Sequence, residues 1–121
     1  MTDPKESGRQ PADSFQNQKM YIESLDLIKL YGPETCRMRI AVRVVDRRKK
    51  PVNLAEVSLM VKPPSGKFFD ACEATRADGV AFFEISGVSS GRWQVGVTDV
   101  DHPEFIADYR DLLMQWRTAR V

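Results

Sequence analysis

This chain has few side chains of the types that catalyse reactions, and their positions in the sequence do not indicate a shared catalytic site. The sequence contains one histidine, His102, and two cysteines, Cys36 and Cys72. A serine or cysteine nucleophile would need His102 as its base, yet this histidine stands beside Pro103 in an acidic stretch that predicts an exposed loop. We therefore expect no catalytic residue and no cofactor, and we expect that the protein is not an enzyme.

The two cysteines leave two interpretations open. Each is a small apolar side chain of the kind that packs in a protein core, which is the interpretation we favour. A disulfide that closes the loop from residue 36 to residue 72 is the alternative. A metal site is not expected at the cysteines, because the single histidine is far from both in the sequence.

Acidic side chains form the best candidate for an ionic site. The group consists of Asp46, Asp99, Asp101, Glu104 and Asp108. Loops at one end of a β-domain could bring several carboxylate oxygens around a calcium ion. The residue spacing of a calcium-binding loop is missing, so we predict a solvated acidic edge and no metal ligand.

Basic side chains form the densest run of charge. Arg37, Arg39 and Arg43 share one face of a predicted strand, and Arg47, Arg48, Lys49 and Lys50 form the turn after it. This stripe could bind phosphate or the acidic surface of a protein partner. Interleaved aromatic residues and glycines are missing, which argues against a nucleic acid. An edge strand also commonly carries Lys and Arg because they prevent pairing with another chain. The candidate partner-binding residues are Arg39, Arg43, Arg47, Arg48 and Lys49.

An apolar stripe near the C-terminus is the second candidate surface. It consists of Tyr109, Leu112, Leu113 and Trp116, which recur at helical spacing. This spacing predicts a short amphipathic helix in the extension 111–121, and a final strand is the competing prediction. The candidate residues Leu112, Leu113 and Trp116 either pack back on the domain or contact a protein partner, including a second copy in a homodimer.

The segments that position these side chains have the pattern of β-strands. Residues 36–46 alternate apolar side chains with arginines, which is the period of a half-buried strand. The same alternation recurs over 55–62 and 92–98, and a shorter strand is predicted at 80–85. Apolar residues between 21 and 31 fit neither strict alternation nor a helical stripe, so we predict a first strand whose bulge switches faces.

Turn residues separate the predicted strands. Pro51 ends the charged turn, and a Pro-Pro-Ser-Gly sequence closes the strand before residue 63. Asp78-Gly79 predicts a tight hairpin, because glycine accepts a positive φ without steric cost. Six or seven short strands separated in this way predict one antiparallel sandwich or barrel.

Length and composition limit the remaining possibilities. The 121 residues, 42% of them apolar, suffice for one compact core. We predict a disordered tail over 1–19 and one domain over 20–110. The net charge of +1 provides no overall field for a polyanion or a membrane. No apolar run is long enough to span a bilayer and no signal-peptide pattern is visible. A cytoplasmic location is expected unless the chain is excised from a secreted precursor.

Three stretches of the sequence resemble a known pattern. They read IAVRVVDRRKKPVNLAEVSL, TRADGVAFFEISG and GRWQVGVTDV. Together they resemble the bacterial immunoglobulin-like and carboxypeptidase-regulatory-like (prealbumin-like) accessory domains of secreted proteases and surface proteins. The resemblance covers about residues 20–110. It implies an all-β, Greek-key β-sandwich of about seven antiparallel strands, in which Phe83 and Trp93 fill the core.

The same resemblance implies a non-catalytic function. Enzymes with related sandwiches need several histidines, and this chain has one. We therefore expect a non-catalytic accessory module for protein or carbohydrate contact or for domain spacing. The alternative is a small intracellular interaction subunit whose basic strand and C-terminal apolar stripe engage an acidic partner.

Overall fold

The structure, a computed structural model, describes residues 18–32, 36–108 and 116–121. These residues form eight β-strands: β1 (Lys19–Tyr31), β2 (Cys36–Asp46), β3 (Glu56–Lys62), β4 (Phe69–Ala74), β5 (Val80–Ile85), β6 (Arg92–Asp101), β7 (Ile106–Ala107) and β8 (Trp116–Arg120). The predicted all-β class is confirmed. Within these ranges the chain has no helix long and apolar enough to cross a bilayer.

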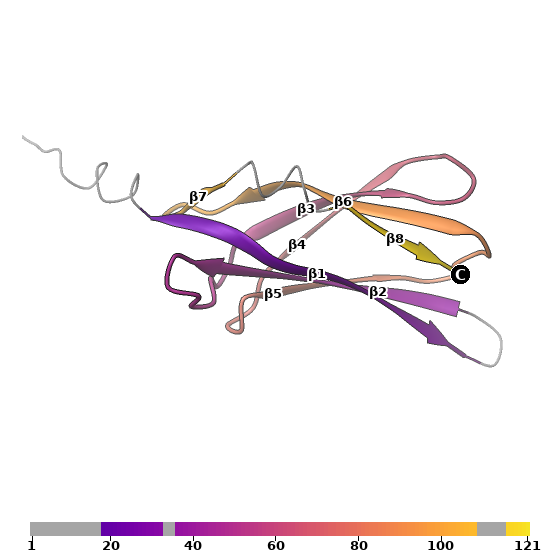
Figure 1. The fold of residues 1–121 in the computed structure, drawn as a ribbon, viewed down its shortest axis with the longest axis horizontal. Coiled ribbons are helices and arrows are strands. Elements are labelled where there is room, and N and C mark those ends of the chain that lie inside the picture. The colour runs from indigo at the N-terminus through magenta and orange to yellow at the C-terminus, as the bar shows by residue number, and fades with distance from the viewer. Residues whose placement is uncertain (1–17, 33–35, 109–115) are drawn as a thin grey trace, which may run out of the picture.

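The strands form two four-stranded sheets. Sheet A has the order β5-β2-β1-β7 and sheet B has the order β4-β3-β6-β8. Neighbouring strands are antiparallel except β1 and β7, which pair in parallel through Lys19 and Met20. Figure 1 shows the two sheets as layers that face each other along the length of the molecule.

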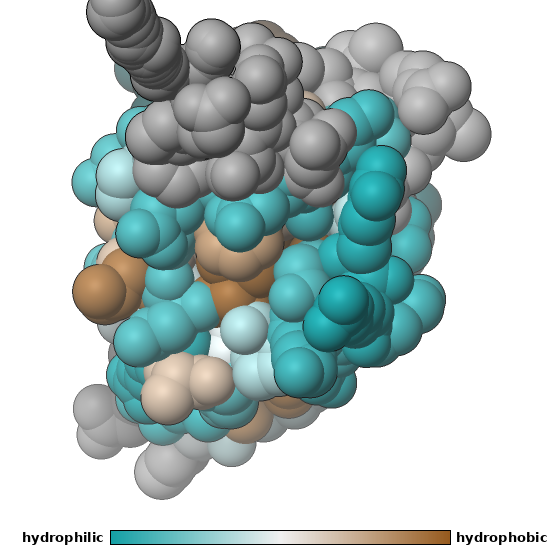
Figure 2. Space-filling model, turned by 90° about the vertical axis from the view of Figure 1, so that its left-hand side faces the viewer, coloured by the Kyte–Doolittle hydropathy of each residue, from teal (hydrophilic) through white to brown (hydrophobic). Residues whose placement is uncertain are grey.

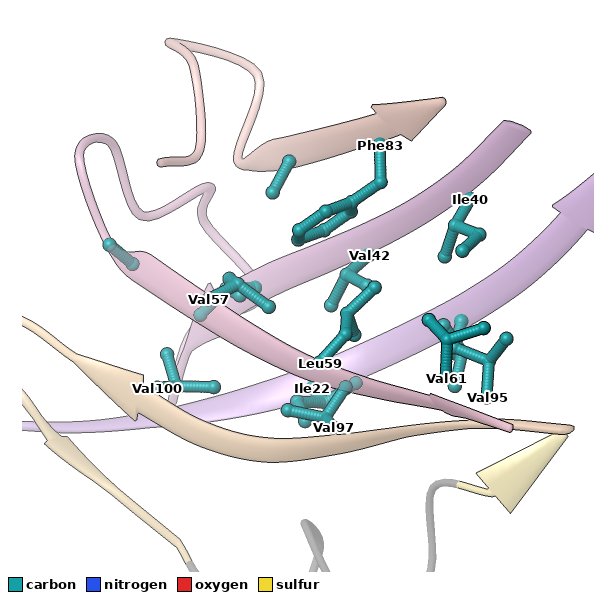
Figure 3. Close-up of a cluster of buried hydrophobic side chains, with 14 of the residues drawn as sticks. Ile22, Ile40, Val42, Val57, Leu59, Val61, Phe83, Val95, Val97 and Val100 are labelled. Carbon is teal, nitrogen blue, oxygen red and sulfur yellow. The ribbon is translucent and has the colours of Figure 1, made fainter. Parts of the chain in front are cut away.

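One apolar core lies between the sheets. It includes Met38, Ile40, Val42 and Val44 from β2, Val57, Leu59 and Val61 from β3, and Val95 from β6, all 0% exposed. Figure 3 shows side chains of both sheets, among them Ile40, Val42 and Leu59, pointing into the shared interior. Phe83 and Trp93, the two predicted core aromatics, are each 5% exposed. Because apolar burial contributes about 25 cal/mol per Å², this interior is the main source of stability.

The bulge predicted in the first strand is confirmed. The register of β1 against β2 shifts between Ile22 and Ser24. The shift keeps Met20, Ile22 and Leu25 buried although their spacing breaks a strict period of two. The strand also begins at Lys19, so the predicted tail is one residue too long at this end.

The turn at Asp78-Gly79 is tight, but it does not form the predicted hairpin. Gly79 has φ 78°, and its N–H donates to the carbonyl of Arg76 at 2.8 Å. The flanking strands belong to different sheets, because β4 pairs with β3 whereas β5 pairs with β2. The turn therefore carries the chain from sheet B to sheet A. Local turn chemistry does not distinguish this crossover from a hairpin.

The predicted C-terminal helix is wrong for the residues that the structure describes beyond 115. Trp116–Arg120 is a strand, and it pairs with β6 from Gly96 to Arg92. As a strand, this segment pairs with the backbone N–H and C=O groups at the free edge of β6, which a helix would leave without protein partners. This pairing explains why the segment is a strand. Leu112, Leu113 and the rest of 111–115 lie outside the described residues.

Candidate functional site

The arginines of β2 lie on the outer face of sheet A. Because β2 lies between β5 and β1, it is an interior strand, and protection of an edge does not explain them. Arg37 forms an ion pair with Glu84 at 2.9 Å, and Arg43 lies 3.3 Å from Glu23 through its Nε. That Nε atom is buried and has no hydrogen-bond partner, so the second contact is a charge pair with poor alignment. These partners reduce the charge that Arg37 and Arg43 offer to a ligand.

The turn between β2 and β3 carries four further cations. Arg47, Arg48, Lys49 and Lys50 are all exposed, and we call them the cationic turn. None of them forms an ion pair with any residue in the described ranges. They therefore form a dense run of exposed positive charge without ion-pair partners in that part of the chain.

Asp46 fixes the backbone of the cationic turn. One of its side-chain oxygens, Oδ1, accepts the N–H of Arg48 at 2.8 Å and the N–H of Lys50 at 3.0 Å. The backbone N–H of Asp46 donates to the carbonyl of Lys50 at 2.9 Å, and Lys49 donates to the carbonyl of Asp46 at 3.0 Å. The carboxylate therefore stabilises the turn through amides and leaves the side chains of the turn free.

A hollow of about 480 Å³ lies beside the cationic turn. It is lined by Gln18, Lys19, Asp46, Arg47, Arg48, Lys50 and Phe105. Lys19 lies here because Met20 is in register with Asp46 at the end of β2. Figure 2, which faces this end of the molecule, shows strongly hydrophilic residues around a recessed apolar area. The hollow thus combines four cations, one acid and an aromatic wall.

Phe105 lines the hollow, Ile106 follows it in the chain next to Lys19, and we call Phe105 and Ile106 the apolar ledge. Phe105 is half-buried against the core, and Ile106 is 43% exposed. Ile106 is in register with Lys19 across the parallel β1 and β7 pair, so both lie on one face of sheet A. This arrangement places exposed apolar surface directly beside the cations.

His102 lies in the loop after β6, where it is half-buried and its ring contacts the backbone. The N–H of Glu104 donates to its Nδ1 at 3.0 Å, so Nε2 carries the ring hydrogen and donates to the carbonyl of Asn53 at 3.0 Å. Its ring meets that of Phe105 edge-on, with centroids 5.0 Å apart. Both ring nitrogens are engaged by backbone, which leaves no free base for a nucleophile.

The other candidate residues lie apart from the cationic turn. Trp116 is on the outer face of sheet B, in register with Gly96, and is 45% exposed. Cys36 lies in sheet A and Cys72 in sheet B, and both are free thiols. Cys72 is exposed, so the core interpretation fails for it. The predicted surface thus separates into the face of sheet A, the cationic turn and the face of sheet B.

The acidic group is not assembled into a metal site. Among the described residues, no three of His, Cys, Asp and Glu lie close enough together to hold a metal ion. Asp46 is committed to the cationic turn instead, and Asp99 lines a different hollow on sheet B. The calcium alternative therefore loses its geometric basis.

Three residues of the site were missed by the sequence analysis. Lys19 had been placed in a tail, and Phe105 and Ile106 followed Pro103 without any alternating pattern. Their approach to the cationic turn depends on the parallel pairing of β1 with β7, which joins residues more than eighty positions apart. No local signal in the sequence encodes that pairing.

Comparison with protein-family models, curated proteins and solved structures finds no match to this chain. The site is accordingly defined by the chain's own geometry. Its distinguishing features are a row of cations on a backbone fixed by Asp46 and an adjoining hollow with one apolar wall.

Proposed function

We propose that this protein is a non-catalytic binding module whose cationic turn engages an acidic surface on a protein partner. The observation that carries the proposal is the turn itself, in which Asp46 fixes the backbone and four cations extend without ion pairs in the described chain. Because the backbone of the turn is already fixed, binding has to order only the side chains, and this favours the use of the turn in recognition. Of the two functions that we expected, the interaction subunit is the one supported by this feature.

The backbone at Lys49 supports the same proposal. Lys49 has φ 66°, a conformation that costs an L-residue about 1 kcal/mol relative to glycine. A lysine in this position adds a cation to the row at the expense of stability. Strain of this kind is typical of positions retained for binding rather than for folding.

The fold that we propose for this module is an immunoglobulin-like Greek-key sandwich. In immunoglobulin domains the first, second and fifth strands share one sheet, and the third, sixth and seventh share the other. The grouping of β1, β2 and β5 in sheet A and of β3, β6 and β8 in sheet B supports this assignment. The short β7, which lies between β6 and β8 in the sequence and pairs with β1, would then be an addition to sheet A, and β4 would extend sheet B.

A peptide-binding experiment tests the function. The probe is a fluorescein-labelled octaglutamate peptide, titrated with the full chain at low salt and followed by anisotropy. We expect the R47E/R48E variant to lose at least about tenfold in affinity, because each reversal replaces attraction with repulsion. Affinity for the unchanged protein should fall as salt rises, since exposed charges are screened within about 8 Å at physiological ionic strength.

The matched control is the K67E/R92E variant. Lys67 and Arg92 are exposed cations outside the cationic turn, and the double reversal alters the net charge by the same amount. Equal losses in both variants would mean that only the net charge matters. That result, or unchanged binding by R47E/R48E, contradicts the proposal.

A further inference from the structure

The aromatic wall of the hollow gives it a second chemical character. Lys19, Arg47, Arg48 and Lys50 supply positive charge, while Phe105 supplies an aromatic side chain. Carboxylates alone would leave the apolar surface of this wall without an apolar partner, and covering that surface is itself favourable. The volume of about 480 Å³ also exceeds what a few carboxylate groups need.

The apolar ledge is held in place by contacts on its far side. Phe105 packs against the core, and its ring meets the His102 ring at an interplanar angle of 78°. The backbone of Ile106 donates to the carbonyl of Gln18 at 2.9 Å, and Asp108 donates to that of Met20 at 3.1 Å. These bonds keep the ledge from collapsing into the hollow, so its apolar surface stays available.

We infer that the ligand is an acidic peptide segment that also carries a large apolar side chain, which packs on Phe105 and Ile106 while its carboxylates meet the cationic turn. The inference rests on the proposed function, since it uses the same turn. It adds an apolar side chain as the feature by which the protein selects one acidic segment over another. An apolar anchor in a preformed recess commonly supplies much of the affinity of an interface, whereas rim charges supply orientation.

A nucleic acid fits these features less well. Proteins that hold single strands stack successive bases on several aromatic faces. Among the described residues, Phe105 is the only aromatic one that lines this hollow, and its ring is half-buried with His102 against it. The second residue of the ledge, Ile106, offers no face for stacking. Aliphatic and aromatic side chains of a peptide suit both residues.

A double-mutant cycle between protein and peptide tests the inference. One probe is an acidic peptide of glutamates around a central phenylalanine, and its partner replaces that phenylalanine with alanine. On the unchanged protein we expect the phenylalanine peptide to bind about tenfold more tightly. On F105A and on I106S we expect this advantage to shrink to about twofold or less. I106S removes an exposed side chain, so it provides a variant that folds even if F105A does not, which a thermal melt checks.

Each outcome bears on one of the two proposals. Equal affinity of the two peptides for the unchanged protein would overturn the apolar anchor and leave the acidic partner intact. An advantage of phenylalanine that survives in both variants would place the anchor elsewhere and would also overturn it. Tighter binding of a thymidine decamer than of either peptide, lost in F105A, would make the ligand a nucleic acid. Loss of octaglutamate binding in R47E/R48E reports only on the cationic turn.

Discussion

At the scale of single residues, Thr75 has the most demanding task in the fold. It is 1% exposed and is the buried polar residue among those that the structure describes. Its hydroxyl donates to the carbonyl of Val52 at 2.6 Å and accepts the N–H of Ala55 at 2.8 Å. Its backbone N–H and carbonyl bond to Ala55 and Leu54. The Thr75 side chain thus provides hydrogen-bond partners for two backbone groups of the loop that leads from the cationic turn into β3.

Replacing Thr75 with valine should therefore destabilise the protein strongly. Valine has nearly the same shape, but it leaves the Val52 carbonyl and the Ala55 N–H buried without partners. At about 1 to 3 kcal/mol for each such group, we expect a loss of about 3 kcal/mol in the free energy of unfolding. Chemical denaturation measures it.

The control for this prediction is T75S, which keeps the hydroxyl and removes only a methyl group. Its expected cost is about 1 kcal/mol. If T75V proved as stable as T75S, the hydroxyl would not be what holds the loop.

At the scale of elements, β8 is attached along its whole length to the edge of β6. Its far end is closed by two hydrogen bonds between Gly91 and Val121, at 2.9 and 2.8 Å. Its near end depends on Trp116, whose ring lies against Gly96. A Cβ atom at Gly96 would come within 2.4 Å of that ring. The absence of a side chain at residue 96 is therefore what lets the indole lie on sheet B.

Substitution of Gly96 by alanine should displace β8. We expect amide hydrogen exchange to accelerate over residues 116–121, with a loss of about 1 to 2 kcal/mol in the free energy of unfolding, because the ring has to move. The same substitution in a W116A background should cost much less. A penalty of equal size in both backgrounds would show that the conflict does not involve the indole.

The strands could be predicted from the sequence more readily than the pairing between them. Alternation identified β2, β3 and β6 from their side chains alone, because one face of each is buried. The sheet that contains β5, and the pairing of Trp116 with Gly96, depend on contacts between distant segments. For the same reason the cations of the candidate site were identified from the sequence, whereas Lys19 and the apolar ledge were not.

At the scale of the whole molecule, the two sheets meet along a side bordered by β1 and β8. Beyond Met20, β1 has no strand partner other than β2 within the part of the chain that is described. Its bulge and the inward Lys29 interrupt this edge, and the Lys29 Nζ donates to the carbonyl of Arg120 at 2.8 Å. Both features are known to discourage pairing between the edges of separate molecules.

Substitution of Lys29 by valine should therefore promote self-association. It would complete an apolar run with Leu25 and Leu27 on the inner face of β1 and release the contact with Arg120. We expect a larger average mass in light scattering after size exclusion, increasing with concentration. The control K67V adds the same side chain to an exposed loop and should leave the mass unchanged. A monomeric K29V protein would contradict this role for the lysine.

The way Asp46 holds its turn has a consequence for protein engineering and for divergence. Because the carboxylate holds the turn through backbone amides, and no side chain of 47–50 contacts it within the described ranges, the conformation of the turn does not depend on which side chains these positions carry. Those positions can be randomised in a display library while the scaffold stays constant. Related chains could likewise exchange one specificity for another by changes confined to this turn, with Asp46 retained.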